Sequence, residues 1–266
     1  MNLRIVSALV WRYLFLYTRT PMRLVELVFW PMVDLLVWGY LTMFIQENAG
    51  STLPYPIAFL LGGILLWDVL FRAQQGVAVS FLEDVWTRNL LNVFVAPVRN
   101  AEYLAATFGV GVLRIFVTVS MMLLVAFFLY EYNLFTMGWS LLPFFLNLLI
   151  CGWSLGMIST ALILRWGQAA ESLAWAVPFF IQPFVAVFYP VASIKPEWLQ
   201  HFALALPPTH VFEGMREVMK TGVFSMSHFA WATGLNVLFM GVAAWIFTST
   251  LAATRRRGLL TKFATQ

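Results

Sequence analysis

Charged residues are scarce in this 266-residue chain, and their scarcity excludes most classes of protein. Asp, Glu, Lys and Arg make up 11% of the residues, hydrophobic residues make up 61%, and the mean hydropathy is +0.82. A soluble domain carries roughly 25% charged residues, so these few charges cannot build a polar shell around the chain. The composition therefore excludes a soluble enzyme, a coiled coil and a disordered chain, and it predicts an integral membrane protein.

Cysteine and lysine are almost absent as well. The single cysteine, Cys151, excludes an internal disulfide framework. A phosphate-binding loop needs a glycine directly before a lysine that is followed by Ser or Thr. The closest match ends at Lys220, and Met219 stands where that glycine should be. We therefore expect no bound ATP, and the spacing of the three histidines predicts no metal site or other cofactor in this chain.

Long apolar runs predict an all-α membrane protein with six transmembrane helices, because about 20 apolar residues cross the hydrocarbon core. The six stretches are Leu24–Ile45, Pro56–Leu82, Tyr103–Tyr130, Leu141–Arg165, Leu173–Ala192 and Phe229–Ala252. Neither an internal repeat nor a linker divides the sequence. Residues 1–266 are therefore expected to form a single transmembrane domain.

The positions of Lys and Arg predict the orientation of the spans. With the N-terminus on the cytoplasmic side, 11 of the 16 cations fall on that side, 3 fall outside and 2 lie within spans. Both termini are thus predicted to be cytoplasmic. Residues 1–23 place apolar side chains on one helical face and arginines on the other, which indicates an amphipathic helix at the inner interface. A basic topology anchor is an alternative that is compatible with it.

Charges inside the spans are informative because each costs about 2.5–3.5 kcal/mol near the bilayer centre. Asp34 lies four residues from Trp30 and four from Trp38, on one helical face. Asp68 and Arg72 are also four residues apart and can form an ion pair. Two interpretations stay open for these charges: a polar seam along a substrate path, or ion pairs that lock helices together.

A possible catalytic motif occurs at residues 152–156, where Gly-Trp-Ser-Leu-Gly matches the G-x-S-x-G nucleophile pattern. That motif works on a strand-to-helix turn with a histidine base nearby. Here the pattern lies within an apolar helix, far along the chain from the histidines. The two glycines are better explained as a helix-packing face, so we do not predict an enzyme.

Two segments between the spans have a more distinctive pattern. Residues 83–100 contain a predicted short amphipathic helix, Val85–Val95, whose exposed apolar side chains would dock on a partner or lie on the membrane surface. Asn100 is placed to cap the following span. Residues 193–228 contain two helical pieces, Pro196–Leu206 and Thr209–Thr221, which are predicted to lie on the outer side. Gly222 is placed to end the second piece.

These segments resemble those of ABC-type-2 permeases, the membrane subunits of bacterial ATP-binding-cassette exporters. The cytoplasmic segment has the family's early Glu, its Leu-Leu pair and its Pro. The outer segment has the Pro-x-x-His/Tyr pattern followed by Arg and Gly. The matching residues are Glu83, Arg88, Leu90, Leu91 and Pro97 in the first segment, and Pro207, His210, Glu213, Arg216 and Gly222 in the second.

The resemblance implies a mechanism and a set of functional residues. Two permease copies would pair as a homodimer in the bacterial inner membrane, in contact with lipid. Two separate ATPase subunits would dock beneath them and use ATP and Mg, and no nucleic acid is expected as a partner. The implied ATPase-coupling helix contains Glu83, Trp86, Arg88, Leu90, Leu91, Phe94 and Pro97. The implied outer gate consists of Pro207, His210, Glu213, Arg216 and Gly222.

Related permeases line their substrate path with the first, second and fifth spans. The residues expected there are Trp30, Asp34, Trp38, Asp68, Arg72, Trp175, Phe179, Gln182, Phe188 and Tyr189. Such side chains suit an amphipathic substrate, namely a drug, a lipid or a lipid-linked glycan. A polysaccharide exporter is an alternative, although its Arg-rich, Gly-Trp opening is not evident. An ATPase-independent transporter or channel is another, but it leaves the predicted cytoplasmic helix unexplained.

Overall fold

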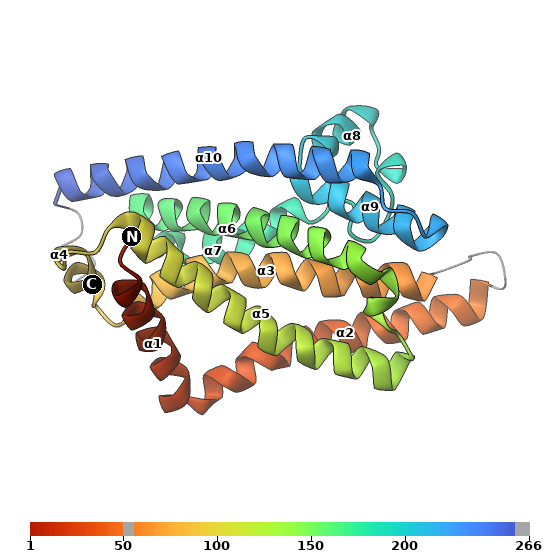
Figure 1. The fold of residues 1–266 in the computed structure, drawn as a ribbon, viewed down its shortest axis with the longest axis horizontal. Coiled ribbons are helices and arrows are strands. Elements are labelled where there is room, and N and C mark those ends of the chain that lie inside the picture. The colour runs from red at the N-terminus through yellow and green to blue at the C-terminus, as the bar shows by residue number, and fades with distance from the viewer. Residues whose placement is uncertain (50–55, 259–266) are drawn as a thin grey trace.

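The computed structural model describes residues 1–49 and 56–258, and in this part the chain is helical and contains no strand (Figure 1). The α-helices are α1 Leu3–Arg19, α2 Pro21–Ala49, α3 Pro56–Trp86, α4 Leu90–Val95, α5 Asn100–Tyr130, α6 Leu141–Trp166, α7 Glu171–Ile181, α8 Glu197–Leu204, α9 Pro207–Thr221 and α10 Met226–Arg256. Three short 3-10 helices join them: η2 Leu134–Ser140, η3 Gly167–Ala170 and η4 Val191–Ser193. The predicted all-α class is confirmed.

Within the described residues, four helical segments are long and apolar enough to cross a membrane. They are Met22–Asn48 in α2, Asn100–Tyr130, Leu134–Trp166 and Met226–Arg256. Each has 27 to 33 residues, which exceeds the roughly 20 that a span requires. These segments correspond to four of the six predicted spans, and the total of six stays a prediction.

The predicted continuous helix over Leu173–Ala192 is wrong. Helix α7 ends at Ile181 after 11 residues, and turns follow it. Pro183 has no backbone N–H to donate to the helical ladder. Ala186 has a φ of 58°, in the left-handed region, so the chain cannot continue as a right-handed helix there. The sequence shows Pro183, but the apolar run around it gives no sign of the left-handed conformation at Ala186.

Glycines allow the central helix α3 to pack closely against α5 and α6. A Cβ atom on Gly76 would lie 2.4 Å from the Cα atom of Gly111 on α5. On α6, a Cβ on Gly152 would lie 2.4 Å from the Leu70 carbonyl oxygen, and Gly156 meets α3 one turn further on. The glycine pair at 152 and 156 therefore forms the packing face that its spacing predicts.

The two ends of the helical bundle differ. Figure 1 shows the N-terminus, α4 and the last turns of α10 at one end, with α8 and α9 at the opposite end. Helix α1 crosses the bundle at an angle and buries Leu9 and Tyr13. Its location at the membrane interface stays a prediction. The two distinctive segments, 83–100 and 193–228, thus lie at opposite ends, as the topology predicts.

Candidate functional site

The segment between α3 and α5 is folded differently from the predicted helix Val85–Val95. Helix α3 continues through Trp86, and only Leu90–Val95 forms the separate helix α4. The interruption occurs at Arg88, whose φ of 54° lies in the left-handed region. A hydrogen bond of 2.9 Å from the Asn89 amide to the Asp84 carbonyl closes the turn. The predicted start of the helix is therefore corrected to Leu90.

Burial divides the predicted coupling residues into two groups. Leu90 is 1% exposed and packs in a core cluster that includes Phe247 and Leu251 of α10. Leu90 is therefore not exposed, unlike the prediction, and its part in coupling to an ATPase stays a prediction. Leu91 and Phe94 are half-buried against the same cluster.

Four of the side chains that are exposed around α4 form what we call the loop surface. It consists of Trp86, Arg88, Val95 and Pro97. Val95 is the most exposed apolar member, at 76%. The indole Nε1 of Trp86 donates to Glu171 Oε2 at 3.1 Å, which connects the end of α3 to the start of α7. The loop surface is therefore rigidly attached to two helices of the bundle.

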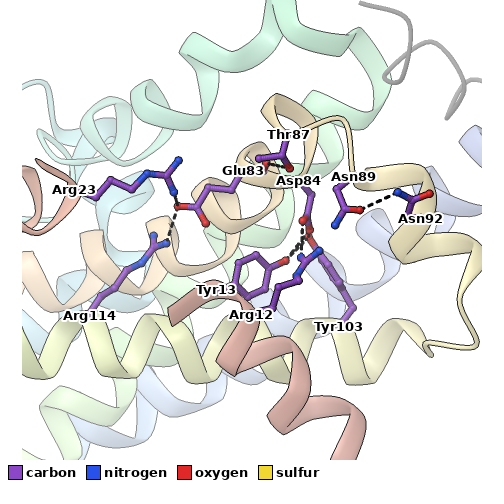
Figure 2. A network of polar contacts seen from close by, with 10 residues as sticks. All are labelled: Arg12, Tyr13, Arg23, Glu83, Asp84, Thr87, Asn89, Asn92, Tyr103 and Arg114. Atoms are coloured by element: carbon purple, nitrogen blue, oxygen red, sulfur yellow. Dashed lines mark hydrogen bonds and ion pairs between the residues drawn. The ribbon is translucent and has the colours of Figure 1, made fainter. Parts of the chain in front are cut away.

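Glu83 is buried inside the chain rather than at this surface (Figure 2). Its Oε1 accepts a hydrogen bond of 3.0 Å from Arg23 of α2 and is 3.5 Å from Arg114 Nη2 of α5. Arg114 also donates to the Gln75 carbonyl oxygen at 3.3 Å. Glu83 thus links α2 and α5 to the end of α3. Its buried carboxylate does not face outward for direct contact with a partner.

The next residue, Asp84, makes a second set of contacts (Figure 2). Its Oδ1 forms an ion pair with Arg12, and its Oδ2 accepts from the hydroxyls of Tyr13 at 2.7 Å and Tyr103 at 3.2 Å. Burial raises the pKa of the Tyr13 hydroxyl well above its usual value, so this group remains a donor. Asp84 therefore attaches α1 to α3 and α5, a link that sequence patterns did not reveal.

A cavity of about 770 Å³ opens between α2, α3, α5 and α7. It is lined by Tyr17, Thr20, Met22, Arg23, Glu26, Leu27, Trp30, Asp34, Phe71, Arg72, Gln75, Val79, Glu83, Trp86, Arg114, Trp175 and Phe179. Five residues of the predicted path are among them: Trp30, Asp34, Arg72, Trp175 and Phe179. Helices that are distant in sequence thus bring the aromatic and charged members of the path together.

The polar wall of the cavity is organised along α3. Arg72 Nε donates to Asp68 Oδ1 at 3.2 Å, so the ion pair predicted from their spacing is confirmed. The Nη1 atom of Arg72 donates to Gln75 Oε1 at 2.8 Å. Gln75 and Arg114 were not in the predicted path, although both are polar residues within predicted spans. Their polarity in an apolar stretch was the available signal.

The remaining predicted path residues lie elsewhere. Trp38 stacks on Phe188 with ring centroids 4.4 Å apart and an interplanar angle of 14°. The Tyr189 hydroxyl donates to the Pro183 carbonyl oxygen within the turns after α7. Together with Asp68 and Gln182, these side chains do not line the cavity. A role for them along a path stays a prediction.

The outer segment is held together by a carboxylate. Glu213 Oε1 accepts 2.7 Å from the Val191 amide and 3.1 Å from Arg216 Nη2. This contact joins α9 to η4, and Gly222 ends α9 with a φ of 72°, as predicted. Pro207 occupies the first turn of α9, where a missing N–H costs nothing.

His210 is buried in the same segment. A ring nitrogen, Nε2, is 2.8 Å from the Leu204 carbonyl oxygen, and Nδ1 is 3.5 Å from Nδ1 of His228. Burial lowers the pKa of His210, and the neighbouring His228 adds to this effect, while the Leu204 carbonyl opposes it. In the described part of the chain, no group of three or more His, Cys, Asp or Glu could hold a metal ion. The gating role of the outer segment stays a prediction.

These features define an all-helical integral membrane protein with an amphipathic cavity beside its central helix. The ABC-2 type transporter family matches residues 4–220, and the chain belongs to that family. A relative, ABC transporter G family member 20 of Dictyostelium discoideum, is 27% identical over 206 residues, which are 75% of this chain and 27% of the relative. The chain thus spans about a quarter of that relative's length. It is the permease component of an ABC transporter, and such a component is not itself catalytic.

Proposed function

We propose that this permease exports an amphipathic substrate from the cytoplasm or the inner leaflet, using ATP that a separate subunit hydrolyses. The observation that carries the proposal is the cavity, whose wall combines tryptophans and phenylalanines with charged side chains. Ligand sites are typically concave and mostly apolar, with a few polar groups that fix orientation. An amphipathic drug, lipid or lipid-linked glycan has an apolar part that suits the aromatic side chains and a polar part that suits the charged ones.

The coupling to ATP follows from the position of α3. This helix contributes Phe71, Arg72 and Gln75 to the cavity and ends at Trp86 in the loop surface. A displacement of the loop surface by an ATPase subunit would therefore move one wall of the cavity directly. In this proposal two ATPase subunits bind two copies of the chain in a bacterial inner membrane, with both termini cytoplasmic.

Two exposed valines at opposite ends of the helical bundle test the coupling. Val95→Glu places a charge on the loop surface, while Val223→Glu places the same charge after α9, where the valine is 66% exposed. The assay isolates the transporter from its native membrane, measures the associated ATPase, and follows ATP-driven uptake of a fluorescent amphiphile into inverted vesicles. We expect Val95→Glu to lose both associated ATPase and uptake, because a charge cannot be desolvated cheaply at an interface. Val223→Glu should retain them.

Four outcomes contradict the proposal. If no ATPase accompanies the native protein, or if uptake proceeds without ATP, the chain acts as a secondary transporter or a channel. If Val95→Glu and Val223→Glu behave alike, the loop surface does not bind the ATPase. Polysaccharide cargo would be indicated by ATP-dependent transfer of a glycan with no uptake of amphiphiles.

A further inference from the structure

Each cation that lines the cavity contacts a carboxylate within the chain, and two of them share Glu83. Arg72 contacts Asp68 at 3.2 Å, Arg23 contacts Glu83 at 3.0 Å, and Arg114 lies 3.5 Å from the same carboxylate. Arg114 additionally stacks over the Tyr17 ring at 5.1 Å. An anionic ligand would have to compete with these contacts.

Two anions in the cavity wall lack such partners. The carboxylates of Asp34 and Glu26, both on α2, are exposed, and neither forms a hydrogen bond or ion pair within the described part of the chain. A third lining carboxylate, Glu83, is 3% exposed and leaves its Oε2 without a hydrogen-bond partner. These three carboxylates therefore have unused acceptor capacity, which a positively charged ligand can satisfy.

Aromatic rings line the same cavity as these carboxylates. Trp30 lies four residues before Asp34 on the same helical face and is 62% exposed. Trp175 and Phe179 of α7 line the cavity, and Phe179 packs on Phe71 with centroids 5.2 Å apart. Aromatic faces attract cations, and tryptophan does so most strongly. A carboxylate beside such rings suits a ligand with a positive centre and an apolar body.

We propose that the cavity binds a lipophilic organic cation, with Asp34 as the counter-charge and Trp30 and Trp175 as its aromatic contacts. This inference rests on the proposed function and names its substrate class. A neutral amphiphile would leave Asp34 uncompensated in a setting of low dielectric constant. An anion would meet carboxylates whose neighbouring arginines are already paired.

Three probes with one fluorophore test the proposal: diphenylhexatriene, its trimethylammonium derivative and its propionate derivative. Binding to the purified permease in nanodiscs is measured by energy transfer from tryptophan, with empty nanodiscs subtracted. We expect the cationic probe to bind most tightly. Asp34→Asn should weaken it by about tenfold, the size of one charge-assisted contact, and should not affect the other two probes. Glu26→Gln should weaken the cation in the same direction.

The control is Glu47→Gln, which removes an exposed carboxylate from the far end of α2. It should leave all three affinities unchanged. The inference is overturned if the anionic probe binds best, if Asp34→Asn binds the cation normally, or if Glu47→Gln weakens the cation equally. It is also overturned if Trp30→Cys forms a crosslink between two copies of the chain and no probe binds, because a second copy then covers the cavity. The binding assay needs no ATP, so the two proposals can fail separately. If the cationic probe fails this test but a neutral amphiphile is taken up with ATP, the cation proposal is refuted and the exporter proposal stands.

Discussion

The contacts of Asp84 predict that one substitution releases α1 from the bundle. Asp84→Ala removes the acceptor of Arg12, Tyr13 and Tyr103, and both tyrosines are 0% exposed. Two of these contacts, those of Arg12 and Tyr13, join α1 to α3, whereas Tyr103 lies on α5. At a net contribution of about 1 kcal/mol for each, the loss of the two costs about 2 kcal/mol. Because 1.4 kcal/mol is a factor of ten, the opening of α1 should become roughly 25-fold more populated.

Hydrogen exchange of the purified protein in nanodiscs measures this opening amide by amide. Amides around Tyr13 should exchange roughly 25-fold faster in Asp84→Ala than in the unmodified protein, while those of the central helix α3 change less. Arg4→Gln removes an exposed charge from the same helix and is the matched control. Equal exchange in the two variants would refute the role assigned to Asp84.

Two further predictions concern packing and pH. Gly76→Ala places a Cβ 2.4 Å from the Gly111 Cα, so we expect the protein to lose about 1–3 kcal/mol of stability. Gly109→Ala is the control, because its Cβ would have its nearest contact at 3.6 Å, and it should unfold thermally like the unmodified protein. Similar melting of the two variants would contradict the close packing. Because burial depresses the pKa of His210 below 6.5, the unfolded state binds its proton first, and stability should be full above pH 6.5 and fall below it. Thermal unfolding measured between about pH 8 and 5 should show this fall in stability. The fall should diminish in His210→Gln but persist in His201→Gln. An unchanged pH dependence in His210→Gln would exclude His210 as its cause.

Local sequence rules predicted those features that depend on a single helix. The pair Asp68 and Arg72 could be predicted because four residues complete about one helical turn. Gly222 could be predicted as a terminator because glycine adopts a positive φ without strain. The glycine pair on α6 followed from the need for close approach between helices. Each of these inferences needed only the spacing or type of residues near one another in sequence.

Features that depend on distant segments could not be predicted in this way. Leu90 was expected on a docking face, but it is buried in a core cluster that also contains Phe247 and Leu251, more than 150 residues further along the chain. Asp84 contacts Arg12 across a separation of 72 residues. Hydrophobic periodicity indicates which face of a helix is apolar, not which neighbour covers it.

The adjacency of Glu83 and Asp84 limits how α3 can move. Successive residues of an α-helix point about 100° apart, and these two bind different partners, Arg23 of α2 and Arg12 of α1. Turning α3 about its own axis would break both contacts at once. A shift along the axis or a tilt can preserve them if α1 and α2 travel with α3. Force applied near Trp86 would then displace three helices as one body, with α3 unable to spin within it.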